Sequence, residues 1–290
     1  MKNLLLVVNR VPVEVSLMLR AKAMADALSA RLYLYHAVYD PIEEINKYVG
    51  LDNFSEVRDE MVRERQSLIE CQLDDVMDHH NCRAEWCKRG SEGVVAWAEN
   101  ISADAILMEM NLDHGLGALV HTPDDWNLLR RASCPVMVLA PGEHPVTSVV
   151  AAVDCLDTSE QQVQLTARIL DNARAMAKVF HAPLNVVSVL PASPMKLAIE
   201  ARVPDSLNVL SVLEQCSIDQ LQAVLDQLGI EAEELQVLEG NPEKILAEEA
   251  AKGGLLVIGS SARKGLAGTL LGNTAERILH RVQGDILVVN

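Results

Sequence analysis

The sequence predicts an α/β fold with two tandem units, each built from a five-stranded parallel sheet with helices on both faces. Short, continuous apolar segments alternate with longer helical patterns along the chain, which is typical of parallel strands joined by helices. A turn-rich segment at Ala140–Val146 (APGEHPV) interrupts this alternation, and the same order of elements then begins again. We therefore expect one domain at residues 1–141 and a second at residues 147–290.

The first unit begins with a buried strand, and amphipathic or charged helical patterns separate its strands. Its predicted strands are Leu4–Val8, Leu32–Val38, Arg83–Lys88, Ala105–Met110 and Pro135–Leu139. Its predicted helices are Pro12–Ala30, Phe54–His80, Ser91–Ile101 and Pro123–Ala132. Ser91 is a candidate N-cap, and the segment Tyr39–Asn53 is predicted to be irregular.

The second unit repeats this order. Its predicted strands are Val149–Asp154, Leu184–Leu190, Leu235–Glu239, Leu255–Ile258 and Ile286–Val289. Its predicted helices are Glu160–Phe180, Leu207–Leu228, Pro242–Lys252 and a last one that begins at Asn273. The segment Pro191–Asp205 is predicted to be irregular.

The spacing of landmarks supports an internal duplication. Thr122 lies thirteen positions after Glu109, and Gly272 lies thirteen positions after Gly259. An offset of 150 residues superimposes both pairs, and it also superimposes the last apolar segments of the two units, Val136–Leu139 and Ile286–Val289. Agreement of a strand, a loop length, a helix and a closing strand indicates one unit present twice.

Composition limits the classes of function. The chain has 290 residues, of which 49% are apolar, so it has enough apolar residues for two globular cores. Its formal net charge of −16 argues against nucleic acids and anionic membranes as partners. The first residues, MKNLLLVVNRVPVE, read as a strand rather than a signal peptide, and the six cysteines follow no disulfide pattern. We expect a cytoplasmic location.

A glycine-rich loop near the end of the chain is the strongest candidate for a binding site. The loop follows the strand at Leu255–Ile258, and Asn273 is expected to be the N-cap of the next helix, with Glu276 completing a capping box. Backbone N–H groups at such a helix start bind anions. Arg263 and Lys264 add local positive charge. The glycines of this loop are Gly259, Gly265, Gly268 and Gly272.

At these residues the sequence resembles the universal stress protein family, whose phosphate loop reads Gly, two residues, Gly, nine residues, Gly, then Ser or Thr. Gly259 and Gly272 match the first and third glycines, whereas Ala262 occupies the second position. The segments TPDDWNLLRR (Thr122–Arg131) and GNTAERIL (Gly272–Leu279) look most like the tandem subgroup typified by universal stress protein E. The resemblance implies a flavodoxin-like, adenine nucleotide alpha hydrolase-like topology and a pseudo-dimer of the two domains through their last strands.

The resemblance also implies a nucleotide site in the second domain, for ATP, with Mg²⁺, or a related adenine nucleotide. In the family, an acid after the first strand contacts the nucleoside, the second strand lends backbone to the base, and the third strand ends in a Gly-x-Pro turn. The residues that match these positions or belong to the loop are Asp154, Val189, Gly240, Gly259, Ser260, Arg263, Gly272, Asn273 and Thr274. Structural interpretations remain open: Asp154 can cap the following turn, and Arg263 can be solvated.

The corresponding loop of the first domain has the wrong chemistry for a phosphate. Pro123 offers no N–H group, and Glu109 is expected to point a carboxylate into the space that a phosphate would occupy. Thr122 and Asp125 are expected to cap the helix. Asp124 and Asp125 also place negative charge at the positive end of the helix dipole, where a phosphate would bind. We therefore expect no nucleotide triphosphate in the first domain.

Two other features have competing interpretations. The segment Pro191–Val212 is apolar for a connection, and it is expected to be a lid or a subunit contact or, alternatively, the wall of an apolar pocket. His79, His80, Cys82 and Cys87 lie close together, but their spacing fits no standard zinc site, so we expect no metal.

The expected function is that of a cytoplasmic stress-response protein with a small-molecule ligand. The alternative is a scaffold or adaptor that binds no nucleotide and holds an apolar, acyl-type ligand. We assign no catalytic residue, because none has the character of a committed general base, and we expect at most a slow ATPase activity. The sequence leaves the protein partners open and allows a homodimer.

Overall fold

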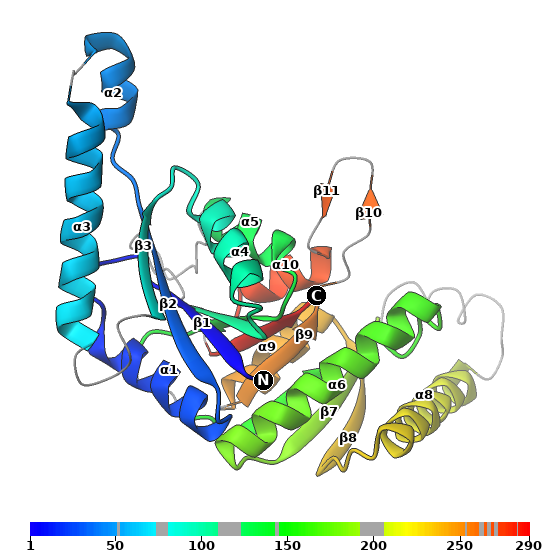
Figure 1. Ribbon diagram of the computed structural model, residues 1–290. Coiled ribbons are helices and arrows are strands. Elements are labelled where there is room, and N and C mark those ends of the chain that lie inside the picture. Colours follow the sequence, from blue (N-terminus) through cyan, green and yellow to red (C-terminus); the bar gives the residue numbers. More distant parts are fainter. Residues whose placement is uncertain are drawn as a thin grey trace. The chain divides into compact units, whose positions relative to one another are not determined.

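The computed structural model describes residues 1–50, 53–73, 81–109, 123–142, 145–191, 206–252, 254–260, 264–265, 268–269, 272–282 and 284–290. The described residues up to 142 form one compact unit, the first half, and those from 145 onward form a second, the second half. Each half is a parallel α/β unit (Figure 1). The expected pairing of the two halves through their last strands stays a prediction.

The first half contains five strands in the order β3-β2-β1-β4-β5, and all of its strand pairs are parallel. The strands are β1 (Asn3–Val7), β2 (Arg31–Val38), β3 (Cys82–Trp86), β4 (Ala105–Glu109) and β5 (Val136–Leu139). The helices are α1 (Val15–Ala27), α2 (Ile42–Val49), α3 (Phe54–Leu73), α4 (Gly90–Asn100) and α5 (Pro123–Arg131). Figure 1 shows α1 and α3 on one face of this sheet and α4 and α5 on the other.

The second half has the equivalent strand order, β8-β7-β6-β9-β12. Its strands are β6 (Ser148–Ala152), β7 (Leu184–Pro191), β8 (Glu234–Gly240), β9 (Gly254–Gly259) and β12 (Ile286–Val289). Its helices are α6 (Glu160–Phe180), α8 (Ser206–Leu228), α9 (Pro242–Ala251) and α10 (Asn273–Leu279). A small antiparallel pair, β10 (Lys264–Gly265) and β11 (Gly268–Thr269), lies between β9 and α10.

The central strands are buried because helices cover both faces of each sheet. Leu5, Ile106 and Val136 in the first half are fully buried, as are Val149 and Val257 in the second. This burial explains why the strands read as continuous apolar segments rather than as alternating ones. Within the described part of the chain, no helix combines the length and the apolar character that crossing a bilayer requires.

Two helices of the first half differ from the prediction. The segment Tyr39–Asn53 was predicted to be irregular, but it contains α2. Asp40 accepts a hydrogen bond from the N–H of Ile42 at 2.8 Å at the start of α2, and Gly50 ends the helix in the left-handed conformation with φ of 62°. The first helix was predicted to begin at Pro12, but α1 begins at Val15.

Candidate functional site

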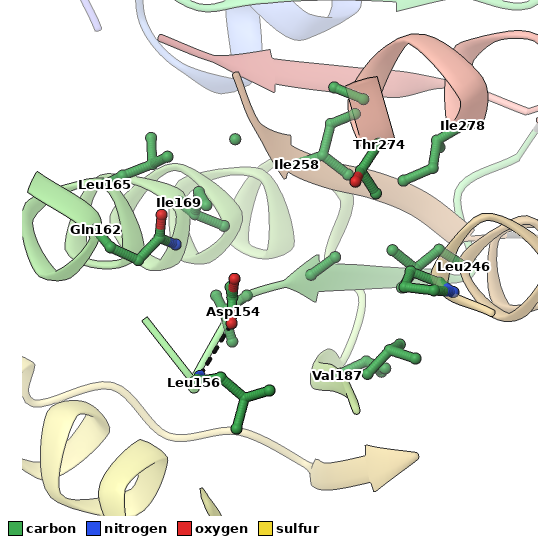
Figure 2. A pocket seen from close by; sticks show the side chains of 16 residues that line it. Asp154, Leu156, Gln162, Leu165, Ile169, Val187, Leu246, Ile258, Thr274 and Ile278 are labelled. Atoms are coloured by element: carbon green, nitrogen blue, oxygen red, sulfur yellow. Dashed lines mark hydrogen bonds between the residues drawn. The ribbon is translucent and has the colours of Figure 1, made fainter. Parts of the chain in front are cut away.

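A cavity of about 360 Å³ lies in the second half at the carboxyl ends of β6, β7 and β9 (Figure 2). Strand order reverses between β6 and β9, which is the place where ligands bind in open α/β sheets. Its size falls in the range of ligand pockets, roughly 300–1,000 Å³. The lining residues are Ala152, Val153, Asp154, Leu156, Gln162, Leu165, Ile169, Val187, Val189, Pro242, Leu246, Ile258, Gly259, Thr274, Ala275 and Ile278.

The loop after β6 places Asp154 at this cavity. The Asp154 carboxylate accepts a hydrogen bond from the N–H of Leu156 at 2.9 Å, so it shapes the turn as an Asx turn does. One carboxylate oxygen makes this bond, and Figure 2 shows the side chain directed toward the space between α6 and α10. An ionised carboxylate has lone pairs left for further donors, so the turn and a ligand do not compete.

Helix α6 supplies an apolar wall of the cavity. Its start is fixed by Ser159, whose hydroxyl accepts a hydrogen bond from the N–H of Gln162. Leu165 and Ile169 follow one turn apart and pack against the end of β9. A Cβ on Gly259 would lie 2.8 Å from Cδ2 of Leu165 and 2.9 Å from Cδ1 of Ile169, so a larger residue there would require both side chains to shift.

Helices α9 and α10 form the opposite side of the cavity. The glycine that ends β8, Gly240, has φ of 151°, and a Cβ there would lie 2.8 Å from Ile245. An ion pair of 2.8 Å between Glu243 and Arg277 connects α9 to α10. Gly272 is the N-cap of α10 and contributes no capping side chain.

A scan against protein-family models matches the universal stress protein family at residues 1–140 and again at residues 146–290. This chain belongs to the universal stress protein family. The universal stress protein E homolog of Haemophilus influenzae is 23% identical over 259 residues, covering 87% of this chain and 84% of that protein. Universal stress protein E of Photorhabdus laumondii is 25% identical over 299 residues, and this match covers 99% of this chain and 94% of that protein.

The solved structures show the same fold over the whole length of this tandem universal stress protein. The crystal structure of a functionally unknown protein from Pseudomonas aeruginosa PAO1 matches with a TM-score of 0.70 at 24% identity. It covers 99% of this chain and 92% of that one. Two domains of one family in one chain agree with the duplication predicted from the spacing of the landmarks.

Four of the residues predicted for the nucleotide site of this universal stress protein line the cavity. They are Asp154, Val189, Gly259 and Thr274, from the loop after β6, from β7, from β9 and from α10 respectively. Asp154 and Thr274 are exposed, so both can meet a ligand from the cavity side.

The other predicted site residues lie elsewhere. Gly240 ends β8 and does not line the cavity, and Gly272 precedes α10. Ser260 is buried, and its hydroxyl donates to the side chain of Asn290. Arg263 lies outside the described residues.

One prediction about the loop requires correction. Asn273 was expected to be the N-cap of the last helix, but Gly272 holds that position and Asn273 is the first helical residue. The structure also contains a feature that the sequence did not predict, because Lys264 pairs with Thr269 and Gly265 with Gly268 in the antiparallel pair β10–β11.

Sequence reasoning missed five helical residues of the cavity wall. Gln162, Leu165 and Ile169 lie on α6, and Leu246 and Ile278 lie on α9 and α10. The four apolar side chains among them belong to the apolar stripes of amphipathic helices, which ordinarily indicate core packing. Their position on helices that follow the carboxyl ends of β6, β8 and β9 is the signal that could have identified them.

The first half has a smaller cavity of about 220 Å³ at the corresponding strand ends. One side of it is occupied by Asp124, the second residue of α5. The Asp124 carboxylate accepts hydrogen bonds from the N–H of Ser91 at 3.0 Å and from the hydroxyl of Ser91 at 2.6 Å. It therefore caps α4, in which Ser91 is the second residue rather than the expected N-cap. Asp125 is buried beside it and lines the same cavity.

Glu109 does not line this first-half cavity, in contrast to the expectation that it would project into it. Burial raises the pKa of its carboxyl, and the neighbouring Glu14 raises that pKa further by its charge and by a hydrogen bond. Arg10 and Arg20 act in the opposite direction. Thr122, the predicted N-cap of α5, lies outside the described residues.

No cluster of three or more His, Cys, Asp or Glu side chains suited to a metal occurs among the residues that the structure describes. Cys82 is buried in β3, and Cys87 follows that strand. His79 and His80, which the sequence places near these cysteines, lie outside the described residues.

Proposed function

We propose that this chain is a cytoplasmic stress-response protein that binds an adenine nucleotide in the cavity of its second half. The observation that carries the proposal is a cavity of ligand size at the reversal of strand order, with an accessible carboxylate at its rim. Asp154 lines this cavity, and in the proposal its carboxylate accepts hydrogen bonds from hydroxyl groups of the sugar. Val189 and Leu246 belong to apolar walls that suit the faces of an aromatic base.

The difference between the halves supports an assignment to the second half alone. In the first half, the N–H and hydroxyl of Ser91 already have the Asp124 carboxylate as their partner. In the second half, Thr274 occupies the equivalent second position of α10 and lines the cavity. A hydroxyl at this position adds no negative charge, whereas a carboxylate would repel an anionic ligand.

Titration calorimetry with ATP and Mg²⁺ tests the proposal. We expect a dissociation constant below about 1 mM, and we expect the Gly272→Glu variant to lose binding, since it places a carboxylate at the start of α10 beside the cavity. Asn172→Glu is the matched control, because it adds the same charge on α6 outside the cavity lining. Absence of binding by the unmodified chain, or equal binding by the Gly272→Glu variant, would contradict the proposal.

A second candidate function is a scaffold or adaptor that holds an apolar, acyl-type ligand. The observation that favours it is a further cavity of about 260 Å³ between α6 and α8, beside the loop that carries Asp154. Cys155, Val163, Leu221 and Val224 give this cavity mostly apolar walls. Mass spectrometry of small molecules released from the purified protein separates the two functions, since the mass and base fragment of an adenine nucleotide support the first and the mass of an acyl compound supports the second.

A further inference from the structure

An open groove of about 880 Å³ follows the outer edge of β3 in the first half. Residues of α3, the whole of β3 and Trp97 of α4 line it. Figure 1 shows α3 and α4 on opposite faces of the sheet, so the groove lies at the sheet edge between them. Among the described residues, it shares none with the cavity at the strand ends of the same half, and it is therefore a separate surface feature.

The outer edge of β3 has one open pairing position. The N–H of Cys87 donates to a carbonyl of β2 at 2.9 Å, so the backbone groups of Cys82, Ala84 and Trp86 point outward by alternation. The amide of Gln66 binds the C=O of Cys82 and the N–H of Ala84. The next two outward groups are the C=O of Ala84 and the N–H of Trp86, and neither has a hydrogen-bond partner within the described part of the chain.

This open position has the same geometry as the one that Gln66 fills. A residue of an added parallel strand donates its N–H to one outward carbonyl and accepts from the outward N–H two residues further on. The Gln66 amide reproduces this pattern at Cys82 and Ala84, and a peptide unit of an incoming segment can repeat it at Ala84 and Trp86. Partners use such edge groups when they bind by adding a strand. The groove therefore suits a short extended segment that begins beyond Gln66.

Arginine side chains flank the open position on both faces of the sheet. Arg58 and Arg63 belong to α3, whereas the guanidinium carbon of Arg83 lies 4.5 Å from the ring centroid of Trp97 on α4. Each arginine pairs with an acid of its own element, and all six side chains are at least 41% exposed. Exposed pairs contribute little to stability, so these guanidinium groups can pair with carboxylates of a partner. The pairs are Arg58–Asp59, Arg63–Glu60 and Arg83–Glu85.

Two of the three tryptophans of the chain line this groove. The Trp86 ring is held by Tyr39 and Phe54, with centroids at 5.8 Å and 6.2 Å, and its Nε1 donates to Glu43 at 2.7 Å. Tryptophan and arginine are the residue types that dominate binding energy in protein interfaces. A ring that is already fixed loses little conformational freedom on binding. The lining therefore has the character of a protein-binding surface.

We propose that this groove binds an extended acidic segment of a different protein. The backbone of that segment pairs with Ala84 and Trp86, and its carboxylates pair with Arg58, Arg63 and Arg83. The net charge of −16 does not prevent this contact, because at physiological salt the Debye length is about 8 Å and the arginines are the nearer charges. A second copy of this chain fits less well, because a twofold contact through the groove would place arginines against arginines.

Fluorescence anisotropy of labelled peptides tests the proposal on the full chain. The probe is a short capped peptide that alternates Glu and Val, and we expect it to bind with a dissociation constant below about 1 mM. The same peptide with Lys in place of Glu should bind at least about tenfold more weakly, because its charges repel the arginines. A Glu-Val peptide methylated at its backbone nitrogens keeps its charges but loses its N–H donors, so it should also bind at least about tenfold more weakly.

A charge reversal in the groove supplies the second readout. Arg63 is 69% exposed, so Arg63→Glu should keep the fold and weaken the Glu-Val peptide by at least about tenfold. Arg168→Glu is the matched control, because it makes the same change at an exposed position of α6 outside the groove. Circular dichroism shows whether both variants keep the fold.

The outcomes separate the parts of the proposal. Equal binding of the Glu and Lys peptides would overturn the acidic partner, and equal binding of the methylated peptide would overturn the strand pairing. If the Glu-Val peptide does not bind below about 1 mM, or binds equally to Arg63→Glu and Arg168→Glu, the groove is not its site. A dimer of the unmodified chain in sedimentation velocity that Arg63→Glu abolishes would assign the groove to a second copy. None of these results depends on a nucleotide in the second half.

Discussion

Gly93 in α4 lies directly against the side chain of Tyr35, which is fully buried. A Cβ on Gly93 would lie 2.0 Å from the Tyr35 hydroxyl oxygen and 2.9 Å from Cζ of the same ring. The Tyr35 hydroxyl donates a hydrogen bond to Glu85 at 3.4 Å, and burial raises the pKa of Tyr35. The position of the tyrosine ring therefore depends on a residue without a side chain.

We expect the Gly93→Ala variant to unfold more easily, although alanine favours helices by about 1 kcal/mol over glycine. Overpacking against Tyr35 should lower the free energy of unfolding by about 1–3 kcal/mol, measured by chemical denaturation. The double variant Tyr35→Phe/Gly93→Ala is the control, because removing the hydroxyl removes the shortest contact. A Gly93→Ala protein as stable as the unmodified chain would contradict this account of the packing.

At the scale of single residues, the sequence predicted roles best where the partner is near in the chain. The turn formed by Asp154 involves Leu156, two residues away, and the local sequence was sufficient to suggest it. Asp124 was expected to act on its own helix, but its partner is Ser91, 33 residues earlier. Such a contact depends on how α4 and α5 pack together, and no local pattern contains that information.

At the scale of elements, the strands were predictable because a buried parallel strand is a local, continuous apolar segment. The residues at which the helices begin were harder to predict from the sequence. The N–H of Val13 donates to the side chain of Gln72 at 2.8 Å, and this contact with α3 replaces the first turn that was predicted for α1. The first helices of the two halves also differ in length: α6 has 21 residues and α1 has 13, and the eight additional residues make α6 about 12 Å longer.

Helix α3 protects the outer strand of the first-half sheet. The amide of Gln66 accepts a hydrogen bond from the N–H of Ala84 at 2.6 Å and donates one to the carbonyl of Cys82 at 3.2 Å. These two groups lie on the outer edge of β3, where another strand could otherwise pair. One side chain therefore occupies the positions that an additional strand would use.

Replacing this amide should destabilise the first half and expose its edge. We expect Gln66→Leu to lower the free energy of unfolding by about 1–3 kcal/mol, because two backbone groups lose their partner. We also expect concentration-dependent association, measured by analytical ultracentrifugation. Gln164→Leu on α6 is the matched control, since Gln164 is exposed and bonds to Glu160 of its own helix. Equal behaviour of the two variants would show that Gln66 does not protect the edge.

At the scale of the whole molecule, the repeated order of elements was visible in the sequence, and both the strand order and the family match agree with it. What the repeat could not reveal is how differently the two copies use the same place in the fold. The second-half cavity is about 360 Å³, and its first-half counterpart is about 220 Å³. Asp124 lines the smaller cavity, whereas Thr274 has the equivalent position in the larger one, and Gln162, Leu165 and Ile169 of α6 line the larger one.

This asymmetry predicts the number of binding sites. We expect calorimetry to give one adenine nucleotide or nucleoside per chain, because the first-half cavity already contains the Asp124 carboxylate. A stoichiometry of two would show that the first half also binds. The variant Asp124→Thr places in α5 the residue type that α10 has at its second position, and it shows whether the acid is what prevents binding there.

The contact between Asp124 and Ser91 has a consequence for regulation. A carboxylate that belongs to the chain is present at a fixed, very high local concentration and never diffuses away. An anionic ligand would therefore meet a resident carboxylate in the first-half cavity, whatever the metabolite levels in the cell. We therefore expect any response to metabolite concentration to begin with binding in the second half, while the first half keeps the same structure.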